Sequence, residues 1–236
     1  MQRVGIVMVL GATAIVGGYV YARPDGIAAH AVSRAADPTT RTTTTPSSTS
    51  STSTTTPLRT SVALVGDSLS AQSVLNERVA LDNAGWRTVT INAQPGRSVR
   101  AVQPASATVP SSGIAAVREI RASGSDPHTW IIELGTNDVS ITRNDAGAIR
   151  GVIDQMLSEI GPGHRVVWVN IHRGDDLASS ATFNHVLAQV AAERNDVVVA
   201  DWAAQATTPG YLITDGIHLT LAGQAAFATV ITTAAG

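Results

Sequence analysis

Val62-Ala63-Leu64-Val65-Gly66-Asp67-Ser68 is the stretch that decides the fold of this chain, because it joins an apolar run directly to a polar turn. A short, uninterrupted apolar run predicts a buried strand. The glycine and the polar residues after it predict a tight turn, and helix-period apolar residues follow at 71–84. Ser68 is therefore expected at the carboxyl end of a strand, where the next helix begins.

The same alternation continues to the C-terminus. Apolar runs predict four more strands at 88–91, 130–134, 166–169 and 197–200, and helical periodicity predicts four more helices at 114–122, 146–160, 181–194 and 221–233. Near-continuous apolar strands separated by helices predict an α/β fold, a three-layer α/β/α sandwich with a five-stranded parallel sheet. Active sites of such sheets lie at the carboxyl ends of the strands, where Ser68 and the segment 135–138 both fall.

Composition limits the range of functions. The chain has 236 residues, 44% of them hydrophobic, and a formal net charge of −2, which suits one domain with a sizeable core and gives no reason to expect a nucleic-acid partner. Cysteine is absent from the sequence, so it offers neither disulfides nor a thiolate metal site. No cofactor is predicted.

The N-terminal region, residues 1–23, is built to enter a membrane. It carries no charge from Val4 to Val20 and ends in Tyr21-Ala22-Arg23. A retained membrane anchor is one interpretation, since a helix of this length spans roughly 26 Å of a bilayer core of about 30 Å. A cleaved signal peptide is the other, with small-residue cleavage character at 20–22 and 29–31. Either interpretation predicts an extracytoplasmic protein, tethered to the membrane or secreted.

Residues 24–57 predict a disordered linker. From Pro38 to Pro57 the sequence reads PTTRTTTTPSSTSSTSTTTP, which contains no hydrophobic residue that could drive packing. Such Thr/Ser/Pro tracts are typical of extended stalks, and O-glycosylation is a guess from composition alone. A folded domain is then expected over residues 58–236.

Ser68, His218 and Asp215 have the side chains of a nucleophilic site. A serine hydroxyl is a weak nucleophile until an imidazole takes its proton, and the imidazole needs a carboxylate to orient it. Asp215 lies three residues before His218, so one turn of chain can place the carboxylate beside the ring. The alternative for this pair is metal binding, but no third ligand lies nearby in the sequence.

Four sequence blocks resemble those of the SGNH, or GDSL, hydrolase superfamily. They are 66–70 (GDSLS), 92–96 (NAQPG), 135–138 (GTND) and 215–220 (DGIHLT), in the order that the family has them. The resemblance implies a flavodoxin-like SGNH hydrolase fold and an acyl-enzyme formed on Ser68. It also implies an oxyanion hole made by the backbone N–H groups of Ser68 and Gly96 and by the side-chain amide of Asn137.

Each of these residues also has a structural interpretation. A serine after a strand often caps a helix, which applies to Ser68 and Ser70. Gly96 follows a proline and could form a simple turn, and Asn137 could brace one. The functional interpretation rests on the blocks as a set.

Three further charged residues lie near the blocks. Glu133 interrupts an apolar strand, so it is expected to be hydrogen-bonded or near an edge, and it could support the site from behind. Arg97 and Arg173 could each meet an anionic or sugar substrate, although a solvated surface position is the simpler expectation for both.

Within the superfamily, the sequence is most similar to the extracytoplasmic domains of peptidoglycan O-acetyltransferases, through residues 95–97, 132–137, 167–170, Asn184 and 215–223. In that branch the domain usually follows a many-helix membrane acyltransferase, which this sequence lacks, and a glycine is common where Asp138 stands. The resemblance therefore implies an esterase or an O-acyltransferase acting on acyl groups, acetyl above all, of cell-envelope carbohydrate. For transfer, the acyl donor would come from a separate membrane protein or from soluble esters.

Two alternatives stay open. A lipid or general carboxylesterase of the same superfamily would use the same site, although sparse aromatic residues and the lack of a long apolar lid segment count against a lipase. A non-catalytic module that binds the cell envelope would keep the sheet without the reaction.

Overall fold

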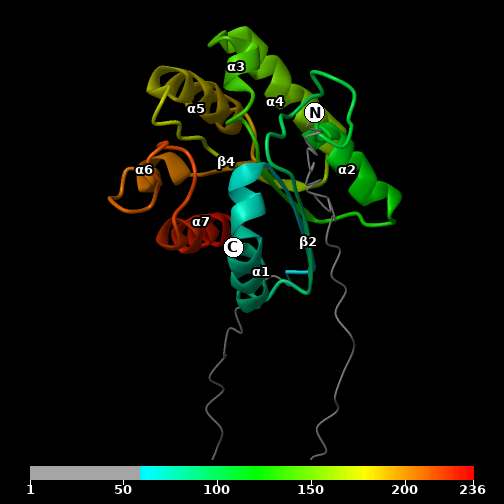
Figure 1. The fold of residues 1–236 in the computed structure, drawn as a ribbon. Coiled ribbons are helices and arrows are strands. Elements are labelled where there is room, and N and C mark those ends of the chain that lie inside the picture. Colours follow the sequence, from blue (N-terminus) through cyan, green and yellow to red (C-terminus); the bar gives the residue numbers. More distant parts are fainter. Residues whose placement is uncertain (1–58) are drawn as a thin grey trace, which may run out of the picture. The chain divides into compact units, whose positions relative to one another are not determined.

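The structure, a computed structural model, describes residues 59–236 (Figure 1). The predictions for residues 1–23 and 24–57 lie outside the described residues. Five strands form one sheet, and their bounds match the five predicted runs to within two residues at each end: β1 Ser61–Gly66, β2 Thr88–Ala93, β3 Thr129–Glu133, β4 Arg165–Val169 and β5 Val197–Ala200.

The strand order is β2-β1-β3-β4-β5, and every neighbouring pair is parallel. The chain runs from β1 to β2 on one side of β1 and then crosses to β3 on the other side. The order of the strands therefore reverses at β1, and the crevice outside the carboxyl ends at such a reversal is where open α/β sheets bind ligands. Gly66 is in register with Ala93 on one side and with Glu133 on the other, so the turns after β1, β2 and β3 meet there.

Two layers of helices cover the sheet, as predicted for a three-layer α/β/α fold. Alternate residues of β1 point to opposite faces: Val65 packs with α2, α4 and α5, and Leu64 packs with α1, α6 and α7. The helices are α1 Ser68–Asn83, α2 Gly113–Ala122, α3 Val139–Thr142, α4 Ala146–Ile160, α5 Leu177–Ala192, α6 Trp202–Ala206 and α7 Leu221–Ala235.

The sequence prediction missed two helices and placed the starts of α1 and α5 three and four residues too late. The short helices α3 and α6 have only one turn or little more, too few residues for a periodic pattern. Helix α5 begins at Leu177 rather than at 181, because the Asp176 side chain accepts the N–H of Ser179 and caps the first turn.

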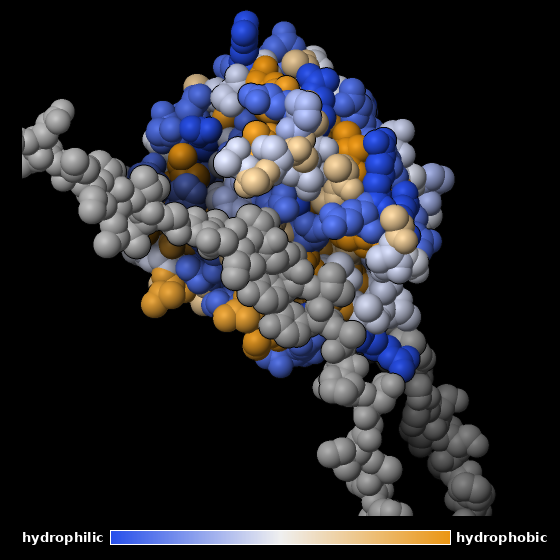
Figure 2. Space-filling model, turned by 45° about the vertical axis from the view of Figure 1, so that its right-hand side comes forward, coloured by the Kyte–Doolittle hydropathy of each residue, from blue (hydrophilic) through white to orange (hydrophobic). Residues whose placement is uncertain are grey.

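The visible surface of the domain is mixed. Figure 2 shows hydrophobic residues as separate patches among hydrophilic ones. Large exposed hydrophobic side chains come from several elements, namely Leu75, Val79, Val102, Leu177, Ile213 and Leu221. Within residues 59–236, none of the helices has the length and apolar character needed to cross a bilayer.

Candidate active site

Ser68 is the first residue of α1, but it does not cap the helix. The cap is Asp67, whose Oδ1 accepts the N–H of Leu69 at 2.9 Å. Because Asp67 takes the capping position, the Ser68 hydroxyl is available, and it lies 3.1 Å from His218 Nε2. Ser70 does not cap the helix either, since its hydroxyl donates inward to Glu77. The capping interpretation of Ser68 and Ser70 was therefore wrong.

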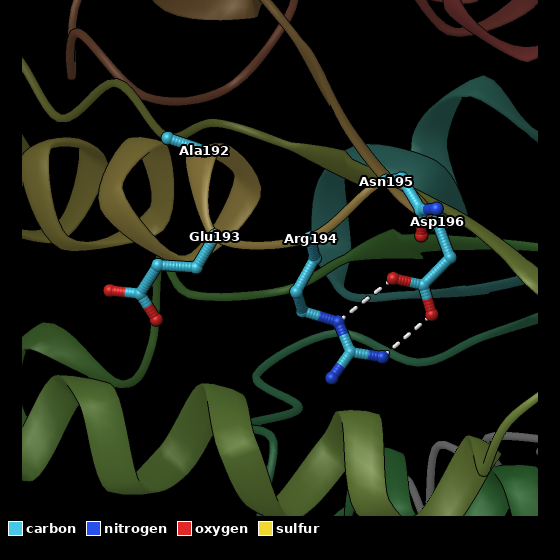
Figure 3. A pocket seen from close by; sticks show the side chains of 5 residues that line it. All are labelled: Ala192, Glu193, Arg194, Asn195 and Asp196. Atoms are coloured by element: carbon cyan, nitrogen blue, oxygen red, sulfur yellow. Dashed lines mark hydrogen bonds and ion pairs between the residues drawn. The ribbon is translucent and has the colours of Figure 1, made fainter.

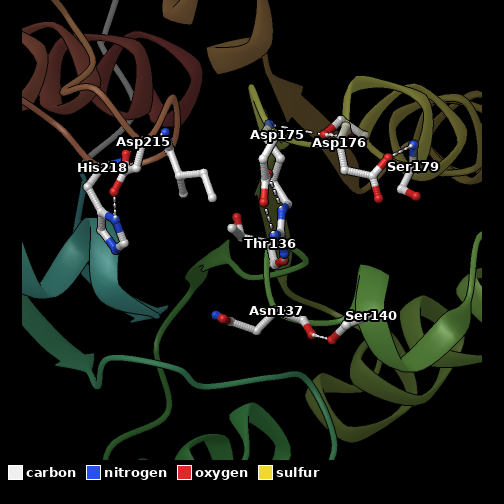
Figure 4. A network of polar contacts seen from close by, with 11 residues as sticks. Thr136, Asn137, Ser140, Asp175, Asp176, Ser179, Asp215 and His218 are labelled. Carbon is white, nitrogen blue, oxygen red and sulfur yellow. Dashed lines mark hydrogen bonds and ion pairs between the residues drawn. The ribbon is translucent and has the colours of Figure 1, made fainter.

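Asp215 determines which nitrogen of the His218 ring carries the proton. Asp215 Oδ2 lies 2.8 Å from His218 Nδ1, and an ionised carboxylate only accepts hydrogen bonds. Nδ1 therefore carries the proton, and Nε2 is left to accept the proton of the Ser68 hydroxyl. The structure thus brings together three predicted residues in an order that suits proton removal from Ser68 (Figure 4 shows the pair on its loop).

The Asp215 carboxyl group is ionised at neutral pH. Burial raises its pKa, but the His218 side chain and the backbone N–H groups of Ile217 and His218 outweigh burial and lower the pKa to about 2. The side chains of Asp215 and His218 are 41% and 34% exposed, so this half of the site faces solvent. Backbone contact holds the loop in place: Gly174 donates its N–H to the carbonyl of Gly216 at 2.8 Å.

Gly96 lies in a β-turn after β2. The Arg97 N–H donates to the Gln94 carbonyl at 3.2 Å, and Gly96 occupies the third position with a φ of +77°. A left-handed φ at this position is what a type II Pro-Gly turn requires. The interpretation of Gly96 as a turn glycine is thus confirmed. Among the described hydrogen bonds, none uses the backbone N–H of Gly96 or of Ser68, so both are available as donors.

Asn137 follows β3, and its side-chain amide nitrogen has two partners. Nδ2 donates to Asp67 Oδ2 at 2.9 Å and to the Arg97 carbonyl at 3.0 Å. An amide nitrogen has two hydrogens, so both are already used. Asn137 therefore ties the turn after β1 to the turn after β2. It can donate to a further oxygen only by sharing one of these two hydrogens.

Asp138 completes this tie. Its buried carboxylate accepts the N–H of Val99 through both oxygens at 3.1 Å, which holds the segment after Gly96 against the loop after β3. Burial raises the pKa of Asp138 to about 7, and the Val99 N–H only partly opposes this. The role of Asp138 could not be predicted from the sequence, because its partner Val99 is 39 residues away.

Arg97 is not on the surface, so the simpler expectation for it was wrong. Its side chain is fully buried, and its N–H groups donate to the oxygens of Gly66, Asn92 and Ser111. Since it holds the ends of β1 and β2 together, it does not reach into solvent toward a substrate. Arg173 does lie near the surface, where it pairs with Asp175 at 2.7 Å and donates to the carbonyl of Thr136.

Three carboxyl groups are buried on the core side of Ser68. Asp67 and Glu77 are fully buried and Glu133 is 3% exposed. Burial raises the pKa of Asp67 to about 6 and that of Glu77 to about 8, and it raises that of Glu133 well above its ordinary value. The expectation that Glu133 is hydrogen-bonded is confirmed, because its Oε2 accepts the N–H of Asp67. Glu77 had no signal in the sequence.

A cavity of about 240 Å³ lies beside Gly96. It is lined by Gln94, Pro95 and residues 105–111, none of which is charged. A second hollow, at the C-terminal end of α5, is formed by Ala192–Asp196 and contains the Arg194–Asp196 ion pair (Figure 3). That hollow precedes β5, so it lies at the amino edge of the sheet, opposite to Ser68. The cavity beside Gly96 is therefore the one that relates to the site.

The described residues do not form a metal centre. No group of three or more histidine, aspartate or glutamate side chains in residues 59–236 is arranged to hold an ion. His218 uses both ring nitrogens, on Asp215 and on Ser68.

The fold and this arrangement of serine, histidine and aspartate define a class of protein, the α/β/α hydrolases with a serine at the carboxyl edge of a parallel sheet. The chain belongs to the GDSL-like lipase/acylhydrolase family, whose model matches residues 61–226. It is therefore an enzyme of the ester hydrolase or acyltransferase type, as the sequence resemblance implied. No curated protein sequence matched the chain.

Solved structures with the same fold include the C-terminal catalytic domain of Streptococcus pneumoniae peptidoglycan O-acetyltransferase A. It has 20% identity and a TM-score of 0.59, over 75% of this chain and 93% of that one. A carbohydrate acetylesterase from Sinorhizobium meliloti has 17% identity and a TM-score of 0.56, over 74% and 97%. An aryl esterase of M. smegmatis has 16% identity and a TM-score of 0.55, over 75% and 99%. At these identities the likeness shows the fold.

Proposed function

We propose that this protein is an exported serine esterase or O-acyltransferase that acts on acyl esters, acetyl above all, of cell-envelope carbohydrate. The observation that carries the proposal is the chain of contacts from Asp215 to His218 to Ser68, at 2.8 and 3.1 Å. Export rests on the uncharged segment Val4–Val20, and the Thr/Ser/Pro-rich linker would let the domain reach substrate away from the membrane.

The reaction begins with attack of Ser68 Oγ on the ester carbonyl carbon. The hydroxyl proton passes to His218 Nε2, and Asp215 stabilises the imidazolium that forms. Negative charge on the carbonyl oxygen is stabilised by the backbone N–H groups of Ser68 and Gly96, which lie in the turns after β1 and β2. Asn137 joins them by sharing a hydrogen that it otherwise gives to Asp67 or Arg97.

Collapse of the tetrahedral intermediate breaks the bond to the alcohol oxygen. His218 Nε2 returns its proton to that oxygen, which leaves an acyl group on Ser68. Water or a sugar hydroxyl then attacks the acyl-enzyme by the same proton route in reverse. Water as the second nucleophile yields the free acid, and a sugar hydroxyl yields an acylated carbohydrate. Ser68 regains its proton in both cases.

Two features support a carbohydrate ester as substrate. Asp215 and His218 are well exposed, so a polymer could approach without a deep channel. The cavity beside Gly96 lacks charged lining residues, which suits a neutral acyl or N-acyl group better than a phosphate or a carboxylate. Two structural neighbours, a peptidoglycan O-acetyltransferase and a carbohydrate acetylesterase, support the same class of substrate.

The test is acetate release from p-nitrophenyl acetate and from O-acetylated oligosaccharide by the purified protein, with and without an unacetylated oligosaccharide as acceptor. Ser68→Ala should lower kcat by about 10⁴-fold or more, and Ser158→Ala, at an exposed serine on α4, serves as the matched control. Acetylated acceptor would indicate a transferase, and acetate release that ignores the acceptor would indicate an esterase. Undiminished turnover by Ser68→Ala would contradict the proposed mechanism.

A further inference from the structure

Glu133 lies directly beneath the turn that carries Ser68. It is the last residue of β3, and its Oε2 accepts the backbone N–H of Asp67 at 2.9 Å and that of Ser70 at 3.2 Å. These two N–H groups belong to residues on either side of Ser68. One buried oxygen from the neighbouring strand therefore holds the backbone of the proposed nucleophile from behind.

Gly66 shows how closely Glu133 fits. A Cβ atom at position 66 would lie 2.9 Å from Glu133 Oε2 and 2.5 Å from Ser70 Cβ, closer than real Cβ contacts. Only glycine leaves room for the glutamate at this point of the turn. The glycine of the Gly-Asp-Ser block and the glutamate of β3 are thus two parts of one packing arrangement.

Asp67 connects Glu133 to the other side of the site. The Glu133 side chain accepts the backbone N–H of Asp67, and the Asp67 side chain in turn accepts from Asn137 Nδ2 through Oδ2 at 2.9 Å. Asp67 therefore lies between Glu133 and the Asn137 amide. A shift of the turn at Asp67 would also move the acceptor of that amide.

Charge balance indicates which carboxyl group is neutral. Asp67, Glu77 and Glu133 are buried near one cation, Arg97, whose hydrogen bonds all go to uncharged oxygens. Uncompensated buried carboxylates are costly and take up protons instead. Burial and the nearby Asp67 carboxylate raise the pKa of Glu133 well above its usual range, and Glu77 adds to this.

We propose that Glu133 is a positioning residue for the reaction, a neutral carboxylic acid that fixes the turn carrying Ser68 and, through Asp67, the direction of the Asn137 amide. The proposal rests on the proposed function, because it concerns the same site. Glu133 does not touch substrate, and it acts through the backbone N–H groups of Asp67 and Ser70, on either side of Ser68.

The experiment compares Glu133→Gln with Glu133→Ala in the full-length protein, with Glu193→Gln as the control at an exposed glutamate. A carboxamide reproduces the neutral acid, since it is uncharged and its oxygen can accept the two N–H groups; alanine removes this acceptor. Measurements are kcat and KM for p-nitrophenyl acetate from pH 5 to 9, thermal unfolding, and the rate at which a serine-reactive phosphonate labels Ser68.

Glu133→Gln should stay within about threefold of the wild type, and its activity should extend to higher pH, because the glutamine has no proton to lose. Glu133→Ala should lose about 100-fold in kcat and in labelling rate with KM little changed, the size expected when reacting groups move by about 1 Å. A merely structural role would not shift the pH profile. Because Glu133→Gln is expected to fold, its pH profile can be compared with that of the wild type even if Glu133→Ala misfolds.

Two results would overturn the inference. One is folded Glu133→Ala that labels as fast as the wild type, and the other is Glu133→Gln that is as damaged as Glu133→Ala. If Ser68 of the wild type neither labels nor turns over an ester, the proposed function itself fails and takes this inference with it. The wild-type measurement therefore separates the two failures.

Discussion

The carboxyl groups on the two sides of Ser68 have pKa values that are shifted in opposite directions. Asp215, on the solvent side, is 41% exposed and its pKa is lowered to about 2 by hydrogen bonds from His218 and the backbone. Asp67, Glu133 and Glu77, on the core side, are buried and their pKa values are raised. The group with the lowered pKa faces the imidazole, and the groups with raised pKa values lie behind the turn that carries Ser68.

The difference shows that environment, not residue type, assigns the roles. A carboxylate that must stabilise an imidazolium needs its charge, and exposure together with N–H donors preserves it. A carboxyl group that must pack under a turn is better neutral, because a buried charge without a partner would destabilise the fold. Variants on each side of Ser68 test this division, from the largest expected change in activation or unfolding free energy to the smallest.

Asp215→Asn should have the largest effect. The amide can donate to Nδ1 and so favour the wrong tautomer of His218, and kcat should fall by about 10⁴-fold at neutral pH. Steady-state kinetics on p-nitrophenyl acetate measures this. Asp175→Asn, a neighbouring exposed aspartate paired with Arg173, should change kcat little. A loss of less than tenfold in Asp215→Asn would mean that the solvent-side carboxylate does not orient His218.

Asn137→Ala probes the link between the two sides. Asn137 bonds to Asp67 and Arg97, and the proposed mechanism has it share one of these hydrogens with the oxyanion, so kcat should fall by about 10² to 10³-fold with little change in KM. Asn195→Ala, at an exposed position in the turn before β5, is the control. A variant that loses stability but keeps kcat would restrict Asn137 to bracing the turns.

Glu77→Gln tests the core side without touching Ser68. The folded pKa of Glu77, about 8, lies above its ordinary value of 4.5. The folded state therefore holds this proton more tightly than the unfolded state, and stability falls as pH rises from about 4.5 to about 8. Glutamine has no proton to lose, so Glu77→Gln should be more stable than the wild type at pH 9, by on the order of 2 kcal/mol. At pH 5, where Glu77 keeps its proton in the folded protein, this gain in stability should be smaller.

Denaturant unfolding at both pH values measures this difference. Glu159→Gln, which removes an exposed partner of Arg118, should show no such pH-dependent gain. Equal stability of Glu77→Gln and wild type at pH 9 would mean that Glu77 is charged in the folded protein.

Gly96→Ala should have the smallest effect. Its φ of +77° costs a residue with a Cβ roughly 1 to 2 kcal/mol, and relief of that strain would turn its N–H away from the oxyanion, for about a tenfold loss in kcat/KM. Gly163→Ala is a matched control, because Gly163 has a φ of +89° but lies before β4, at the far edge of the sheet. If the two variants lose turnover equally, the Gly96 N–H is not a donor in the reaction.

Much of the site could be predicted because its signals are local. Each predicted site residue lies in a short block directly after a strand or before a helix: Ser68, Gly96, Asn137 and the Asp215–His218 pair. The parallel order of the strands brings the first three to one edge of the sheet. Glu133 was also signalled, since a carboxylate inside an apolar strand needs partners. Arg97 was misplaced, because an arginine after a turn looks exposed until its five donors find acceptors 5 to 31 residues away.

By itself, the sequence determined the parallel α/β/α fold, the sheet edge that holds the candidate site, and the serine, histidine and aspartate that the structure brings into contact. Hydrophobic periodicity and short motifs are local properties, so they can be read along the chain. Only the tertiary structure decided the state of each carboxyl group and the partners of Asn137. Those depend on burial and on contacts between distant segments, such as the 66 residues that separate Asp67 from Glu133.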